Sequence, residues 1–139
     1  MLPEQLRRHS LAIISLLVAL TALGYNTWRN ELTEQNRNIR FAGFEMLLHA
    51  SELRRISYLA HYDRDSILGN PRSGWVKVMI IQDLSMIMPS TLQAAADELY
   101  GTWEQEWQGL GSDSGSIEAI EMALDAVRAG ILETLEELE

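Results

Sequence analysis

The chain has 139 residues, which leaves room for one domain and a short additional segment. Beyond Glu4, Arg7 and Arg8, the rest of the chain carries 9 basic and 19 acidic side chains, a net charge of −10. A domain this acidic is repelled by phosphate backbones, so nucleic acid is excluded as an expected partner. The absence of cysteine excludes disulfides, zinc–thiolate sites and thiol catalysis.

Residues 9–28, which follow a short basic tail (1–8), form an apolar segment with no Asp, Glu, Lys or Arg. Twenty helical residues span about 30 Å, the thickness of the hydrocarbon core of a bilayer. Tyr25 and Trp28 stand where an interfacial aromatic belt is expected, and the two arginines of the tail flank the other end. This pattern predicts a transmembrane helix, with the lipid bilayer as a partner.

A cleaved signal peptide is the alternative, because Ala22-Leu23-Gly24 has the small-x-small form of a cleavage site. We favour retention, since the polar segment that follows continues the helical pattern without a break. Residues 29–38 are therefore predicted to form a polar helical stalk.

The charges on the two flanks give no clear orientation. The tail arginines favour a cytoplasmic N-terminus, but Arg29, Arg37 and Arg40 lie close to the other end. A short basic tail before an apolar run is typical of exported domains, and ten of the eleven basic residues are arginine, as in GC-rich bacterial genomes. We expect a single-pass protein of a bacterial inner membrane with a periplasmic C-terminal domain.

Within the apolar segment, small residues recur at spacings of 3, 4 and 3: Ala12, Ser15, Ala19 and Ala22. Such a face lets two membrane helices approach closely, although small residues are also simply common in these helices. It is a candidate packing face for a homodimer.

Residues 39–139 are predicted to form an acidic helical bundle. The first helix of this region carries two apolar stripes, which predicts contact with more than one neighbour, and it is expected to end near Leu68 with Gly69 as its C′ residue. One stripe is Ile39, Ala42, Met46, His49, Leu53, Ile56 and Ala60; the other is Phe41, Phe44, Leu48, Arg55, Leu59 and Tyr62.

The segment 75–88 is apolar enough for a strand, but no second strand-like run could pair with it, so a helix ending or kinking at Pro89 is predicted. A capping box from Ser90 to Gln93 opens the next helix, and Ser116 is the predicted N-cap of the last. The expected fold is all-α: the membrane helix and stalk lead into an antiparallel bundle of three or four helices. In this arrangement the pair joined at Pro89 returns toward the membrane and the last helix runs outward again.

Glu45, His49 and Glu52 share a helix face, which could gather metal ligands for an enzyme. An ordinary polar patch is favoured, because the chain has no Glu-x-x-His pair of the kind that di-iron bundles use. No catalytic motif occurs, so we expect neither an enzyme nor a cofactor.

Four polar or aromatic residues gather where the first bundle helix nears its end: Tyr58, His61, Tyr62 and Asp65. They could bind a small ligand or respond to pH, since histidine titrates near neutrality. The simpler interpretation is a bundle cap.

The stretch from Leu23 to Glu45, LGYNTWRNELTEQNRNIRFAGFE, resembles the juxtamembrane region of small uncharacterised single-pass membrane proteins of gammaproteobacteria. That resemblance implies no activity that could be transferred. The overall plan is also similar to the helical-bundle sensor domains of chemoreceptors and sensor kinases, but this chain shows no second span or signalling domain.

Three functions follow, in order of preference. The first is a membrane-anchored interaction or accessory module that binds a protein partner or a second copy of itself. The second is an extracytoplasmic small-ligand or pH sensor, and the third is a metal-dependent enzyme.

Overall fold

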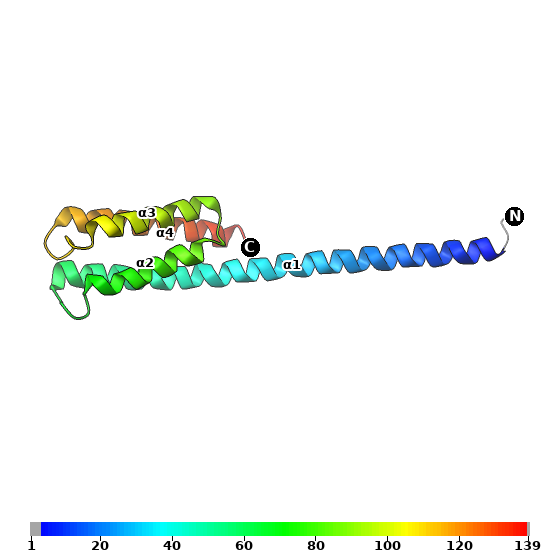
Figure 1. Cartoon of the computed structure of the whole chain (residues 1–139), viewed down its shortest axis with the longest axis horizontal. Coiled ribbons are helices and arrows are strands. Elements are labelled where there is room, and N and C mark those ends of the chain that lie inside the picture. Colours follow the sequence, from blue (N-terminus) through cyan, green and yellow to red (C-terminus); the bar gives the residue numbers. More distant parts are fainter. Residues whose placement is uncertain (1–3, 139) are drawn as a thin grey trace. The chain divides into compact units, whose positions relative to one another are not determined.

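Four α-helices and one π-helical turn make up the described part of the chain, and the α-helices are labelled in Figure 1. The computed structural model describes residues 4–138, with side chains from residue 9 onward, and this part holds no strand. The elements are α1 (Glu4–Tyr58), the π-helical turn η1 (Leu59–Asp63), α2 (Pro71–Ser85), α3 (Ser90–Glu106) and α4 (Ser114–Glu136). The all-α prediction is therefore confirmed, including a helix rather than a strand over most of 75–88.

The chain divides into two compact units, Met1–Arg37 and Asn38–Glu139. From residue 4 onward, where the structure is described, the first unit consists of the N-terminal part of α1. The second contains the rest of α1 with η1, α2, α3 and α4, and it is a four-helix bundle.

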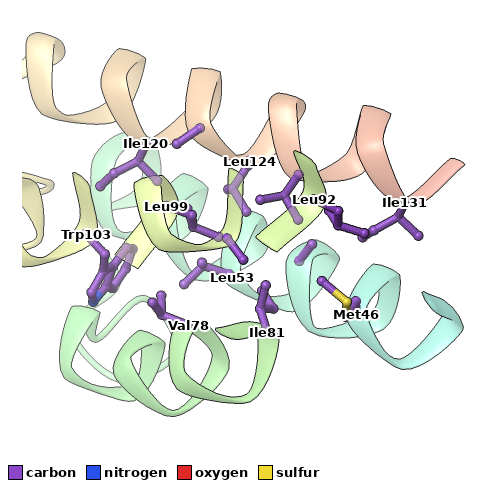
Figure 2. Close-up of a cluster of buried hydrophobic side chains, with 14 of the residues drawn as sticks. Met46, Leu53, Val78, Ile81, Leu92, Leu99, Trp103, Ile120, Leu124 and Ile131 are labelled. Atoms are coloured by element: carbon purple, nitrogen blue, oxygen red, sulfur yellow. The ribbon is translucent and has the colours of Figure 1, made fainter. Parts of the chain in front are cut away.

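The core of the bundle is built around one face of α1. Met46 and Leu53 are completely buried there, against side chains from all three other helices (Figure 2). The faces that α3 and α4 bury repeat at helical spacing: Leu92, Ala96, Leu99 and Trp103 on α3, and Ile117, Ile120, Leu124, Val127 and Ile131 on α4. Fully buried members of this core include Val78, Ile81, Leu92, Leu99, Trp103, Leu110, Ile120, Leu124, Val127 and Ile131.

The two stripes of α1 differ in burial. The stripe containing Ala42, Met46 and Leu53 enters the core, whereas Phe41, Phe44 and Leu48 are 66%, 59% and 52% exposed. The predicted contact with more than one neighbour is made by the first stripe alone, because α2, α3 and α4 all pack on one side of α1 (Figure 2). Its opposite side has no neighbour within the bundle.

Helix α1 ends earlier than predicted. The α-helical part stops at Tyr58, η1 follows, and Arg64 takes a left-handed conformation with φ 51°, so Leu68 lies in the loop. Gly69 is not the helix-terminating residue. It is buried, and a Cβ there would lie 2.4 Å from the backbone nitrogen of Ala60, so glycine is needed for close packing of the loop on α1.

At Pro89 the chain reverses and does not merely kink. A tight turn, in which Met88 N donates to Ser85 O at 2.8 Å, joins α2 to α3, and Gln82 Nε2 donates to Asp97 Oδ1 across the pair at 2.9 Å. The bundle consequently has four separate helices. Because α2 and α3 each reverse the chain, α4 runs opposite to the predicted direction.

Two contacts at opposite ends of the bundle show this direction. Arg40, near the start of the bundle part of α1, donates to the backbone oxygen of Leu138 at 2.9 Å. At the other end of α1, a ring nitrogen of His61 lies 2.8 Å from the backbone oxygen of Leu110, between α3 and α4. The end of α4 therefore lies beside the beginning of the bundle part of α1 (Figure 1).

Both predicted side-chain caps are wrong in detail. Helix α3 begins after Pro89 without a side-chain cap, and Gln93 donates its amide to Met88 O at 2.8 Å and not to Ser90. The N-cap of α4 is Asp113, whose carboxylate accepts from the backbone nitrogens of Gly115 and Ser116, both at 3.2 Å.

Gly74 and Gly101 form a matched pair for testing core packing. A Cβ on Gly74 would lie 2.2 Å from Cζ2 of the buried Trp103 ring, whereas one on Gly101 meets nothing within 4 Å. We expect Gly74→Ala to lower the free energy of unfolding by about 1–3 kcal/mol through overpacking. Gly101→Ala should raise it by up to about 1 kcal/mol through helix propensity. Urea denaturation followed by circular dichroism measures both, and a stabilised Gly74→Ala variant would contradict the packing described.

The Asp113 cap predicts acid sensitivity. Hydrogen bonds from the Ser116 hydroxyl and the Gly115 nitrogen hold the pKa of this carboxyl below its usual value. A group with a lowered folded-state pKa stabilises the fold above its unfolded pKa, about 3.9, and loses this effect as pH falls through the folded value. Asp113→Ala should lower the melting temperature at pH 7, and the difference from the wild type should shrink on acidification toward pH 2. An unchanged difference across that range would exclude an ionised cap.

Candidate membrane segment and interaction surfaces

The N-terminal part of α1 is an apolar helix, and the described residues of its unit include no second helix that packs on it. It contains an 18-residue window of mean hydropathy 1.6, none of which is buried, and is long and apolar enough to cross a bilayer. Its large side chains from Leu11 to Trp28 are 56% to 64% exposed. Arg7 and Arg8, the predicted basic flank, have side chains outside the described residues.

The polar groups of this segment are suited to an apolar environment. The Thr21 hydroxyl donates to the backbone oxygen of Leu17 at 2.8 Å, so it needs no external acceptor. The rings of Tyr25 and Trp28 lie side by side with centroids 6.1 Å apart. Such a pair at the end of an apolar helix is typical of the membrane–water interface.

The predicted packing face on this helix is open. Ala12, Ser15, Ala19 and Ala22 are all exposed, and Ala22 lines a shallow hollow with Leu17, Val18, Thr21 and Tyr25. The described structure contains one copy of the chain, so homodimerisation through this face remains a prediction.

On the bundle, Phe41, Phe44 and Leu48 form the outer stripe of α1. They recur at spacings of 3 and 4 on the side of the helix opposite Met46 and Leu53, and more than half of each side chain is exposed. From the sequence they are part of the second apolar stripe of a helix predicted to contact more than one neighbour. Composition alone could not distinguish the two stripes.

Charged residues border the outer stripe on both sides. Along one edge, Arg54 binds α4, with Nε 3.1 Å from Glu121 Oε2 and Nη2 2.5 Å from Asp125 Oδ1, and Arg40 lies on the same edge. Along the other edge, Glu52 forms an ion pair with Lys77 of α2. Glu45 lies on the same edge, seven residues before Glu52. The positive edge therefore faces α4 and the negative edge faces α2.

Two of the carboxyls on these edges have shifted pKa values. Partial burial of Glu121 raises its pKa, and the neighbouring Arg54 guanidinium only partly counteracts this. Hydrogen bonding to Lys77 is the main cause that lowers the pKa of Glu52.

Three of the four residues in the polar–aromatic cluster lie together. The rings of Tyr58 and Tyr62 are 4.8 Å apart, and His61 meets the edge of Tyr62 at the same centroid distance. Tyr58 and Tyr62 are four residues apart, so they face the same side of the helix where α1 passes into the π-helical turn η1. His61 also contacts the Leu110 carbonyl, which links η1 to the α3–α4 loop.

Asp65 has a different role in the structure. Its Oδ1 accepts from the backbone nitrogens of Ile67 and Leu68, both at 2.9 Å, and these bonds lower the pKa of its carboxyl. The side chain thus organises the loop after η1. Tyr58 and Tyr62 are exposed, so the cluster forms a surface and not an enclosed pocket.

The predicted metal-ligand set forms an ion-pair network. His49 Nδ1 lies 3.3 Å from Glu52 Oε2, its Nε2 lies 3.9 Å from Glu45 Oε2, and Lys77 occupies the same Glu52 oxygen. An ammonium group beside the central carboxylate opposes cation binding. Among the described residues, no group of three histidines or carboxylates could hold a metal ion.

Comparisons with protein-family models, with curated proteins and with solved structures find no match to this chain.

The Glu52–Lys77 pair can be tested with a double-mutant cycle. Glu52→Gln, Lys77→Met and the double variant should give a coupling free energy of roughly 0.5–1 kcal/mol at pH 7, the size usual for half-exposed pairs. Because the pKa of Glu52 is lowered in the folded state, this coupling is present above its unfolded pKa, about 4.3, and disappears as pH falls through the folded value. Urea denaturation at pH 7 and pH 3 measures it, and equal coupling at both pH values would exclude the ion pair as its source.

Proposed function

We propose that this chain is a single-pass membrane protein whose N-terminal helix anchors an acidic four-helix bundle that acts as a protein-interaction module, without catalytic activity. The observation that carries the proposal is the unburied apolar window of α1. Moving one large apolar side chain out of water gains roughly 1.5–3 kcal/mol, and a bilayer removes the whole segment from water at once.

Retention of the anchor is supported by the continuity of α1. The helix passes through Ala22, Leu23 and Gly24 without interruption, so the small residues of the alternative cleavage site are held in helical backbone. We place the bundle on the periplasmic side of a bacterial inner membrane, because Arg7 and Arg8 before the apolar segment favour a cytoplasmic location for that flank.

An interaction role is supported by the outer stripe of α1. Exposed aromatic residues that contribute nothing to the core are typical of binding surfaces. A ligand-sensing role receives less support, because the Asp65 carboxylate is bonded to the backbone of its own loop. The nearby hollow, lined by residues of α1, of the loop after η1 and of α2, is open to solvent.

The absence of cysteine allows a direct topology experiment. Ser112→Cys places a thiol in the exposed α3–α4 loop, and Gln5→Cys places one before the apolar segment. In cells with a permeabilised outer membrane, a membrane-impermeant maleimide should label Ser112→Cys at full-length mass and leave Gln5→Cys unlabelled until lysis. The reverse pattern would place the bundle in the cytoplasm, and a mass lacking the first residues up to Gly24 would identify a cleaved signal peptide and overturn the anchor.

Carbonate extraction gives the matched control for anchoring. The wild-type chain should stay in the membrane pellet at alkaline pH. Leu16→Arg/Leu20→Arg should move to the supernatant, because each arginine at the centre of a membrane helix costs about 2.5–3.5 kcal/mol on insertion scales.

A further inference from the structure

We propose that the outer stripe of α1 is the interface of a parallel homodimer, in which each copy packs Phe41, Phe44 and Leu48 against the same residues of a second copy. This deepens the proposed function by naming the partner. It rests on that function for one point, that both copies are anchored in the same membrane.

The spacing of the exposed residues on α1 suits a helix–helix seam. Positions 41, 44, 48, 51, 55 and 58 follow alternating steps of 3 and 4, and every residue at these positions is exposed. They are the a and d positions of a heptad pattern, with Phe41 and Leu48 at a and Phe44 at d. Ser51 and Arg55 are polar, so the apolar contact is centred on residues 41–48.

The flanking charges select the second copy and its direction. In this pattern Arg40 and Arg54 occupy g positions, whereas Glu45 and Glu52 occupy e positions. In a parallel pair, a g residue meets the e residue five positions later on the other helix, which places Arg40 of each copy beside Glu45 of the other. In an antiparallel pair, g would meet g and e would meet e, so like charges would oppose one another.

Arg40 is available for this contact. It uses one guanidinium nitrogen for the Leu138 carbonyl, and its remaining donors are free to bind a carboxylate. Glu45 makes only a long contact of 3.9 Å to His49. A two-fold axis between the copies would generate the Arg40–Glu45 pair twice.

The face needs no rearrangement of the bundle. The outer stripe lies opposite the buried residues Met46 and Leu53, and the other three helices pack on the far side of α1. Docking therefore leaves the core and the ion pairs of Arg54 and Lys77 in place.

Disulfide cross-linking of the full-length chain in its membrane tests the interface. Ser51→Cys is at a d position that faces its own copy in a parallel pair, within the roughly 4.4–6.8 Å between Cα atoms that a disulfide spans. Ala129→Cys, exposed on α4, is the control. Under brief oxidation we expect Ser51→Cys to form covalent dimer on the order of tenfold faster than Ala129→Cys, because docking holds the thiols at a high effective concentration.

A second pair of variants separates this interface from contact between the apolar segments. In the Ser51→Cys background, Phe41→Ser/Phe44→Ser should reduce dimer formation to the level of the Ala129→Cys control while leaving the melting temperature of the bundle unchanged. Glu45→Arg should also weaken the dimer, and Arg40→Glu/Glu45→Arg should restore it by exchanging the charges.

The outcomes separate the two proposals. Equal cross-linking at positions 51 and 129, unaltered cross-linking in the phenylalanine variant, or a product with the mass of a different protein would overturn the homodimer even if carbonate extraction confirms the anchor. Specific cross-linking in a chain that carbonate releases would support the dimer and overturn the anchor.

Discussion

The bundle depends on the burial of one face of α1. Met46 and Leu53 are completely enclosed, and every other helix contributes side chains to the space around them. Close approach is made possible by small residues at the contacts: a Cβ on Gly43 would lie 3.1 Å from Leu135, and Gly74 lies against Trp103. Because all three remaining helices pack on the same face, the opposite face of α1 is left to solvent or to a partner.

The periodic parts of the fold were predictable from sequence. In α3 and α4 a single apolar stripe alternates with polar residues, so helical spacing identifies both the helix and its buried side. The inner stripe of α1 was identified for the same reason. The sequence did not show that the outer stripe of α1 is left uncovered. Phe41, Phe44 and Leu48 are as apolar as the core residues, and only the positions of the other helices determine which stripe is covered.

Chain reversals and helix ends were less predictable, because they depend on a few local hydrogen bonds. Pro89 is compatible with a kink, a helix end or a reversal, and the turn bond from Met88 N to Ser85 O is part of the reversal that forms. Asp113, Ser114 and Ser116 are all good N-cap residues, so sequence alone could not identify Asp113. The π-helical turn η1 at the end of α1 has no recognisable sequence signal.

The charge distribution bears on how two acidic bundles could associate. Each carries a net charge of about −10, and this repulsion acts over long distances, but at 0.1 M salt charges separated by more than about 10 Å are largely screened. Opposite charges in direct contact at the edge of an interface are screened much less. In the proposed dimer, an Arg40–Glu45 pair beside three apolar residues would provide local attraction where the overall charge opposes association. Phe41 and Phe44 lie outside the core, so burial within the bundle does not account for them, whereas the proposed dimer interface would.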